Sequence, residues 1–191
     1  MLIPDDVPGV MKKLALSAGE EILRQYGQEI RVEYKEDRSP VTAADKAANE
    51  LIVGGIRSAF PGIPILAEES ADDAARLGKR YCFIVDPLDG TREFIKKNGE
   101  FTVNIALTEN GRPVAGVIYV PVLKELYFAS QGTGAYSVVN GREKRIAVSR
   151  RVGDIRLAKS RSYYGPELDR LIEINHITHV VIAGSAYKGC L

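Results

Sequence analysis

Val85-Asp86-Pro87-Leu88-Asp89-Gly90-Thr91 is the most informative stretch of this 191-residue chain, both for its fold and for its candidate site. It follows an apolar run at residues 81–85 that is rich in strand formers, and its Asp-Pro and Asp-Gly pairs are typical of a turn. We therefore expect both acids in a loop at the carboxyl end of a strand, where α/β folds place their ligands. Such a turn can direct two carboxylates and the Leu88 carbonyl to one point. Mg²⁺ takes oxygen ligands of this kind.

Three further acids are candidates for the same site. Glu68 and Glu69 close an apolar run at residues 63–67, and a parallel strand pairing with residues 81–85 would deliver them to the same edge of the sheet. We interpret Glu69 as a solvated acid or one that lies behind the ligands. Asp45 lies at the start of a helix, with Thr42 as the expected N-cap, and is placed to orient a hydroxyl group.

An Asp-Pro-x-Asp-Gly run taken alone is most often a surface turn. Here other motifs accompany it in order and in spacing, and together the set resembles the inositol monophosphatase superfamily of Mg²⁺-dependent, lithium-sensitive phosphatases across nearly the whole chain. The motifs are Pro40-Val41-Thr42-Ala43-Ala44-Asp45, Ala67-Glu68-Glu69-Ser70, Asp86-Pro87-Leu88-Asp89-Gly90-Thr91 and Gly184-Ser185-Ala186.

Two details of sequence favour one branch of that superfamily. Thr91-Arg92-Glu93-Phe94 resembles the Thr-Lys-Glu-Phe of the 3′(2′),5′-bisphosphate nucleotidases of the CysQ type, whereas inositol monophosphatases more often have Thr-Thr-Asn-Phe. The segment from Gly184 to Cys190 also matches the nucleotidase pattern Gly-Ser-x-x-Lys-x-Cys.

The resemblance implies a role for each acid of the motifs. Glu68, Asp86, Asp89 and the Leu88 carbonyl would hold two or three Mg²⁺ ions, for which Mn²⁺ could substitute. Thr91 would orient the attacking water while Asp45 accepts the threonine proton, with Glu68 also catalytic and no phosphoenzyme formed.

The substrate would be held by a second group of residues. Gly90 and the backbone N–H groups after it form a natural anion site, because a glycine turn there leads into a helix start. The other candidates for substrate contact are Thr91, Ser160, Arg161, Gly184, Ser185 and Lys188. Ser160-Arg161-Ser162 is short enough to arise by chance, and a lone arginine there could equally be solvated.

Composition limits the partners and the compartment. A net charge of +1, with 27% charged residues, offers no basic stripe for a nucleic acid polymer, whereas a small phosphorylated substrate needs only local charge and metal. Cys82 and Cys190 form no disulfide framework, which favours the cytoplasm. The N-terminus does not resemble a signal peptide and no stretch is long and apolar enough to cross a membrane.

The hydrophobic pattern predicts an α/β chain. Helices are expected at residues 8–26, 42–60 and, shorter, 70–77, with a strand at 30–34. Residues 101–148 predict an antiparallel sheet with a hairpin at Asn140-Gly141, and strands at 155–158 and 180–183 flank a helix at 166–174. The resemblance implies the α-β-α-β-α sandwich of sugar phosphatases, with a metal-binding α+β domain at 1–150 and the beginning of a second α/β domain at 151–191.

One departure from the family concerns the C-terminus. Relatives usually continue to a Trp-Asp-x-Ala-Ala-Gly motif whose aspartate ligates a metal, yet this chain has no tryptophan and ends at Leu191. We expect a C-terminally truncated protein with an incomplete second α/β layer. Residues 185–191 are expected to begin a helix, and a homodimer would cover the sheet face left open.

The sequence is therefore compatible with two classes of function. The first is a Mg²⁺-dependent phosphomonoesterase that removes the 3′-phosphate of adenosine 3′,5′-bisphosphate to give AMP and phosphate, with inositol-1-monophosphatase or fructose-1,6-bisphosphatase as the alternatives. The second is an inactive remnant that binds only metal or phosphate.

Overall fold

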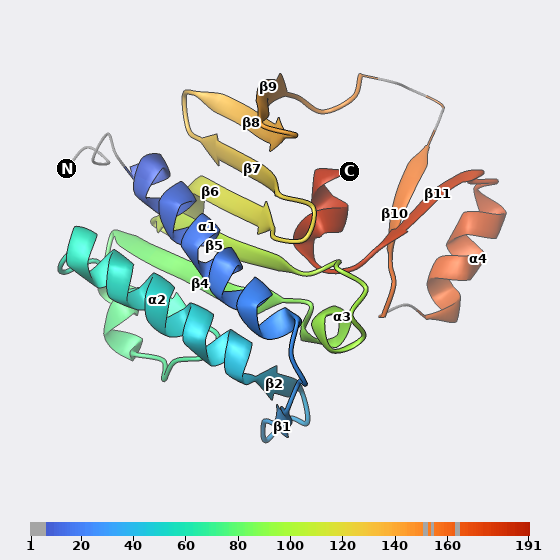
Figure 1. The fold of residues 1–191 in the computed structure, drawn as a ribbon. Helices are drawn as coiled ribbons and strands as arrows, with labels where there is room; N and C mark the ends of the chain where they lie inside the picture. The colour runs from blue at the N-terminus through green and yellow to red at the C-terminus, as the bar shows by residue number, and fades with distance from the viewer. Residues whose placement is uncertain (1–6, 151–152, 154, 163–164) are drawn as a thin grey trace.

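A computed structural model describes residues 7–150, 153, 155–162 and 165–191. Its centre is a sheet in the order β3-β4-β5-β6-β7-β8-β9, in which β3 and β4 are parallel and all other neighbours are antiparallel (Figure 1). The strands are β3 (Ile65–Ala67), β4 (Tyr81–Asp89), β5 (Thr102–Glu109), β6 (Arg112–Val120), β7 (Glu125–Ser130), β8 (Gly134–Val139) and β9 (Arg142–Ile146). The antiparallel sheet and the β8–β9 hairpin confirm the sequence prediction.

Two long helices, α1 (Val7–Tyr26) and α2 (Ala43–Ala59), cover one face of this sheet (Figure 1). In α1, Met11, Ala15, Ala18 and Ile22 are fully buried, and their spacing of three or four residues makes one apolar stripe. They join the sheet residues in a single hydrophobic core. Both helices confirm the predicted ranges to within a residue or two.

A short hairpin brings a polar turn toward the end of the sheet. β1 (Val32–Tyr34) pairs antiparallel with β2 (Pro40–Thr42), and α2 begins directly after β2. Lys35 lies in the connecting turn. The expected strand at residues 30–34 is therefore shorter than its alternating pattern suggested.

β4 differs from the sequence prediction in a way that matters for the site. Residues 86–89 were expected in a loop, but Asp86 pairs with Asn104 and Asp89 with Thr102, with an irregularity between them. β4 therefore runs on to Asp89 through a bulge. A β-bulge bends a strand and redirects side chains, so it achieves what the expected turn would have done.

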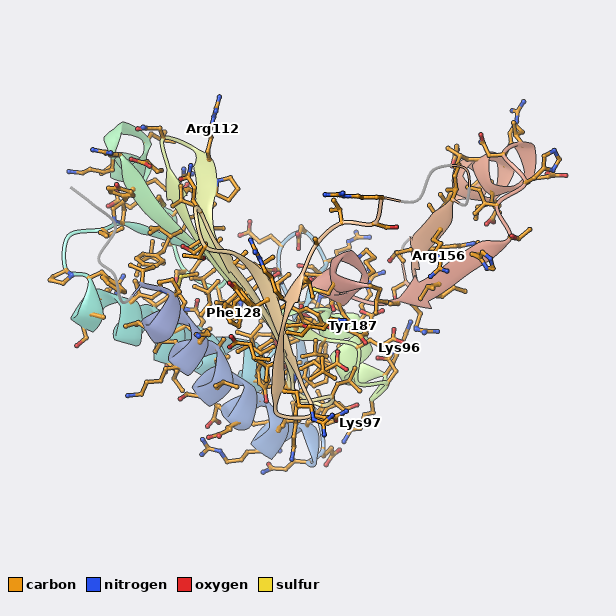
Figure 2. All side chains as sticks on the ribbon, turned by 90° about the horizontal axis from the view of Figure 1, so that it is seen from above. Lys96, Lys97, Arg112, Phe128, Arg156 and Tyr187 are labelled. Carbon is orange, nitrogen blue, oxygen red and sulfur yellow. The ribbon has the colours of Figure 1, made fainter. Side chains whose placement is uncertain are left out.

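The last part of the chain forms a smaller unit beside the main sheet. β10 (Arg156–Ser160) pairs parallel with β11 (His179–Ala183), α4 (Pro166–Ile174) connects them, and the 3₁₀ helix η2 (Ala186–Cys190) follows. Figure 2 shows β10, β11 and α4 standing out to one side of the main body. The mixed α/β class is confirmed.

Two predicted helices take another form. Residues 70–77 contain only the 3₁₀ helix η1 (Ala74–Gly78), whose N-cap Asp73 accepts a hydrogen bond from Ala75 N. Residues 185–191 likewise form a 3₁₀ turn instead of starting an α-helix. Within the described ranges, no helix has the length and apolar character needed to cross a bilayer.

Candidate active site

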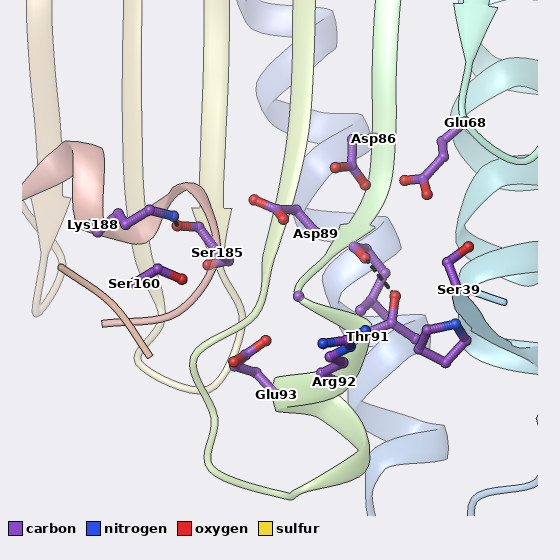
Figure 3. A pocket seen from close by; sticks show the side chains of 13 residues that line it. Ser39, Glu68, Asp86, Asp89, Thr91, Arg92, Glu93, Ser160, Ser185 and Lys188 are labelled. Carbon is purple, nitrogen blue, oxygen red and sulfur yellow. Dashed lines mark hydrogen bonds between the residues drawn. The ribbon is translucent and has the colours of Figure 1, made fainter. Parts of the chain in front are cut away.

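A polar cavity of about 230 Å³ lies at the end of the sheet where β4 ends (Figure 3). It brings together residues from the β1–β2 hairpin, β3, β4, α3 (Thr91–Ile95), β10 and η2. Its lining residues are Ser39, Pro40, Glu68, Asp86, Leu88, Asp89, Gly90, Thr91, Arg92, Glu93, Ser160, Ser185 and Lys188. Most of the predicted site residues therefore meet in one place.

Asp86 lies in an environment that disfavours its charge. Its Oδ1 atom is buried and has no hydrogen-bond partner, and within the described ranges it is the only carboxylate oxygen of which this is true. Burial, together with the negative charges of Asp89 and Glu68, raises the pKa of Asp86 to about 8. A buried carboxylate oxygen with no donor is the arrangement expected of a metal ligand.

Asp89 is held from two directions. Its Oδ2 atom accepts hydrogen bonds from the backbone N–H of Ala186 and, at 3.3 Å, from Asn104 Nδ2. Asn104 belongs to β5 and Ala186 to η2, so both the main sheet and the smaller unit fix this carboxylate. Asp89 also lines the cavity.

Glu68 and Glu69 follow β3, which confirms that the parallel strand delivers them to the same edge. Lys35 Nζ bridges the two carboxylates, at 2.9 Å from Glu68 Oε1 and 2.5 Å from Glu69 Oε1. The Glu68 side chain is 48% exposed and lines the cavity, whereas that of Glu69 is 9% exposed. Burial would lower the pKa of Lys35, but its hydrogen bonds to Glu69 and Glu68 outweigh burial and raise it.

A buried hydrogen-bond relay joins the start of α2 to the cavity. Asp45, only 2% exposed, accepts from Thr42 N at 2.7 Å and Thr42 Oγ1 at 2.6 Å through Oδ2, forming a capping box. Its other oxygen, Oδ1, accepts from Thr91 Oγ1 at 3.1 Å. Burial raises the pKa of Asp45 above its usual value, although these hydrogen bonds lower it. Thr42 is the predicted N-cap, and Asp45 serves the helix and Thr91 at once.

Gly90 supplies the backbone conformation that starts α3. Its φ of 93° is left-handed, and it is the N-cap residue of the helix. A Cβ atom there would approach Ser185 Cβ at 3.2 Å and the Glu100 carbonyl oxygen at 3.3 Å. Gly90 therefore combines a turn that needs glycine with close packing on both sides.

The predicted substrate contacts divide into two groups. Ser160, Ser185 and Lys188 line the cavity, on the side opposite Thr91 (Figure 3). Arg161 and Gly184 do not; both instead donate hydrogen bonds to Glu100, which was not among the predicted site residues. Arg161 thus forms an ion pair with Glu100 in this structure, and its contact with substrate stays a prediction.

Known proteins show the family to which this chain is related. The inositol monophosphatase family model matches residues 4–182. The chain belongs to the inositol monophosphatase family. It is 45% identical over 183 residues to a 3′(2′),5′-bisphosphate nucleotidase CysQ of Salmonella typhimurium and 41% identical to that of Escherichia coli strain K12, covering 94% of this chain and 73% of each relative. The resemblance to this family is thus confirmed.

Solved structures of the family have the same fold. CysQ of Bacteroides thetaiotaomicron superposes with a TM-score of 0.83 at 39% identity, covering 100% of this chain and 77% of that one. An IMPase of Thermotoga maritima superposes with a TM-score of 0.79 at 30% identity, covering 93% of this chain and 68% of that chain. Their shared fold extends over both the main sheet and the smaller unit.

The residues of this family member fit a hard cation by their chemistry. Asp86, Asp89, Glu68 and the Leu88 carbonyl offer oxygen donors only, and one buried oxygen of Asp86 has no donor in the described part of the chain. In the described ranges, no three His, Cys, Asp or Glu side chains converge closely enough to hold a metal. Glu68 Oε1 instead contacts Lys35 Nζ at 2.9 Å, so Lys35 competes with a cation for this carboxylate.

Four lining residues were missed by the sequence analysis as site residues: Ser39, Pro40, Arg92 and Glu93. Arg92 and Glu93 directly follow Thr91, and their position in the first turn of a helix beside the acids was a usable signal. Glu93 is 2% exposed and accepts a short hydrogen bond from Ser162 Oγ. Ser39 and Pro40 offered no comparable signal, because only the β1–β2 pairing brings them to the cavity.

Proposed function

We propose that this chain is a metal-dependent phosphatase that removes the 3′-phosphate from adenosine 3′,5′-bisphosphate, giving AMP and phosphate. The observation that carries the chemistry is the buried Asp86 carboxylate beside Asp89, facing the same cavity as the Thr91–Asp45 relay. The choice of nucleotide is supported by relatives named 3′(2′),5′-bisphosphate nucleotidase CysQ.

The charges of the cavity support a metal as part of the binding site. Its lining carries four carboxylates, Glu68, Asp86, Asp89 and Glu93, against two cationic side chains, Arg92 and Lys188. Such a surface repels a phosphate group unless cations are added. When bound by Glu68, Asp86, Asp89 and the Leu88 carbonyl, the metal would polarise the phosphoryl oxygens and activate a water molecule.

Thr91 and Asp45 would position that water. The Thr91 hydroxyl donates to Asp45, which leaves the lone pairs of Oγ1 to accept a hydrogen bond from a water in the cavity. Asp45 is itself fixed by two hydrogen bonds from Thr42, so the hydroxyl is held in one orientation. This arrangement favours direct attack by water and requires no covalent intermediate.

The opposite side of the cavity would hold the rest of the nucleotide. Gly90 and the backbone N–H groups at the start of α3 would bind the scissile phosphate, and Lys188 would face the second phosphate. Ser160 and Ser185 offer hydroxyl groups to the ribose. Arg161 and Gly184 would contribute through Glu100 and not by direct contact.

We assign Mg²⁺ as the natural metal, two or three ions per site, with Mn²⁺ as a substitute and Li⁺ as an inhibitor. Oxygen-only donors and waters suit Mg²⁺ in particular. We expect the protein in the cytoplasm, since Cys82 and Cys190 are both free thiols. A homodimer remains a proposal, as does the division into domains at residues 1–150 and 151–191.

The test compares three substrates under one set of conditions. Phosphate release from adenosine 3′,5′-bisphosphate, inositol 1-phosphate and fructose 1,6-bisphosphate is measured with Mg²⁺ and with EDTA. We expect the highest kcat/KM for the nucleotide and no turnover in EDTA. A preference for either sugar phosphate would assign the chain to another branch, and no turnover of any substrate would favour a protein that only binds metal or phosphate.

A further inference from the structure

One wall of the cavity is carried by the smaller unit and not by the main sheet. Ser160 ends β10, whereas Ser185 and Lys188 lie after β11, and all three line the cavity. We call these three residues the substrate wall. Because β10 and β11 stand out beside the main body (Figures 1 and 2), contacts between the two parts must fix the distance from this wall to Asp86 and Asp89 on β4.

Glu100 makes three of these contacts. It lies between α3 and β5, and its carboxylate accepts from Arg161 Nε and Nη2, both at 2.6 Å, and from Gly184 N at 2.7 Å. Arg161 Nη2 also donates to the Ile182 carbonyl at 3.0 Å. Arg161 directly follows Ser160, and Gly184 directly precedes Ser185. One carboxylate therefore ties the ends of both strands of the smaller unit.

The backbone around Glu100 is packed without free space. A Cβ atom at Gly184 would lie 2.5 Å from Glu93 Cγ and 2.9 Å from the Glu100 carbonyl oxygen. The same oxygen would lie 3.3 Å from a Cβ atom at Gly90. Gly90, which starts α3, and Gly184, which precedes Ser185, thus pack on the same peptide group. A displacement of α3 would therefore displace the backbone next to Ser185 as well.

The backbone conformation of Ser185 indicates strain in the link between β11 and η2. Its φ of 48° and ψ of −165° are sparsely populated for a residue with a side chain. Its two neighbours are held on either side, Gly184 N by Glu100 and Ala186 N by Asp89. These two hydrogen bonds keep Ser185 in the cavity wall.

We infer that Glu100 and Arg161 form a positioning pair that sets the distance between the substrate wall and the phosphate-binding residues. This role rests on the proposed function, since the wall is where the nucleoside part of the substrate would bind. In the described part of the chain, neither side chain lines the cavity, so both act through Ser160 and Ser185. The Arg161 guanidinium holds the pKa of Glu100 below its usual value, which keeps the pair charged at neutral pH.

If Arg161 contacted substrate directly, Glu100→Gln would have the opposite effect on nucleotide binding. If Arg161 bound the nucleotide, Glu100→Gln would release the guanidinium from its partner, and binding of the nucleotide would stay the same or tighten. If the pair positions the wall, Glu100→Gln weakens nucleotide binding. The sign of one measurement therefore separates the two roles.

The experiment uses Glu100→Gln and Arg161→Lys, with Glu109→Gln as the matched control. Glu109 forms a similar ion pair with Arg80, at 2.6 Å to Nε, at the far end of β5 and away from the cavity. Hydrogen exchange of the backbone amides of β10 and β11 is measured first. Loss of the charge in Glu100→Gln, and of the two-bond Arg geometry in Arg161→Lys, should speed exchange there roughly tenfold, with no change in α1 or α2 and none in Glu109→Gln.

Product inhibition then measures the effect on the site. AMP carries the nucleoside and would contact the substrate wall, whereas inorganic phosphate would occupy only the metal side. We expect inhibition by AMP to weaken roughly tenfold in both test variants, and inhibition by phosphate to change less than about twofold. Unchanged or tighter AMP inhibition in Glu100→Gln would overturn the positioning role.

The two readouts separate this role from the proposed function. If the wild-type protein releases no phosphate from any substrate, the proposed function fails, and amide exchange still decides whether the pair holds the smaller unit. Unchanged exchange in β10 and β11 of both variants would overturn the positioning pair on its own.

Discussion

Asp86→Asn should make the metal-free protein more stable at alkaline pH while abolishing its response to metal. The buried Asp86 carboxylate has an oxygen without a donor, and burial with the nearby charges of Asp89 and Glu68 raises its pKa from 3.8 to about 8. Because the native state binds this proton more tightly than the unfolded state, the free energy of unfolding falls as the pH rises from about 4 to about 8. An amide at this position carries no charge and avoids that loss.

The structure sets an upper limit on the size of the effect. A pKa of about 8 in place of 3.8 corresponds to at most roughly 6 kcal/mol, at about 1.4 kcal/mol for each tenfold change in proton affinity. Relaxation and water penetration reduce such values, since effective dielectric constants in proteins are near 20. We therefore expect Asp86→Asn to exceed the wild type by about 2 to 4 kcal/mol above pH 8, and to lie close to it near pH 5.

Urea unfolding at pH 5 and pH 8.5, in EDTA and in Mg²⁺, measures these differences. Asp89→Asn is the matched control, because Asp89 accepts from Ala186 N and Asn104 Nδ2. Asparagine keeps one acceptor oxygen but exchanges these charge-assisted hydrogen bonds for neutral ones, which should cost about 1 to 2 kcal/mol without metal. If Asp86→Asn is destabilised at pH 8.5, or gains as much from Mg²⁺ as the wild type, then Asp86 is not a metal ligand held in an unfavourable state.

Three further outcomes follow from the same contacts. Thr42→Ala should cost about 1 kcal/mol of stability through loss of the Thr42 hydroxyl from the capping box, but it should retain most activity because the backbone N–H of residue 42 still holds Asp45. Asp45→Asn should cost a similar stability and lower kcat by roughly 10² to 10⁴; equal kcat values would contradict the Thr91–Asp45 relay. Mg²⁺ or Mn²⁺ at 100 times its Kd should stabilise the wild type by about 2.7 kcal/mol, and a melting temperature unchanged in millimolar metal would argue against a preformed site. Lys35→Met should tighten Mn²⁺ binding measured by calorimetry, because the Lys35 ammonium group now forms an ion pair with the Glu68 carboxylate and competes with the metal for it. Weaker binding would show that Lys35 favours metal binding.

Local sequence signals identified Asp86 and Asp89 as site residues, but they did not predict the bulged strand on which these residues lie. The Asp-Pro-Leu-Asp stretch has the composition of a turn, and only pairing with Asn104 and Thr102 on β5 makes it a bulged strand. That pairing depends on residues more than a dozen positions away in the chain. The bulge still directs Asp86 and Asp89 to one cavity, so the functional prediction survived an error in local structure.

Contacts between segments that lie far apart in the chain could not be predicted from local sequence patterns. Arg161 pairs with Glu100, which lies 61 positions earlier, and no local pattern marks that pairing. Lys35 was not selected at all, because only the β1–β2 hairpin brings it to Glu68 and Glu69. In contrast, Thr42 and Asp45 were placed correctly at the start of α2, since capping residues three positions apart are a local signal.

The reaction of adenosine 3′,5′-bisphosphate with this chain and Mg²⁺, followed by ³¹P NMR, tests the central claim most directly. The account predicts that the 3′-phosphate signal disappears, that the 5′-phosphate signal remains as AMP, and that inorganic phosphate appears in equal amount. Asp86→Asn should leave both signals of the substrate unchanged. Persistence of the 3′-phosphate with the wild-type chain in Mg²⁺, or loss of the 5′-phosphate instead, would contradict it.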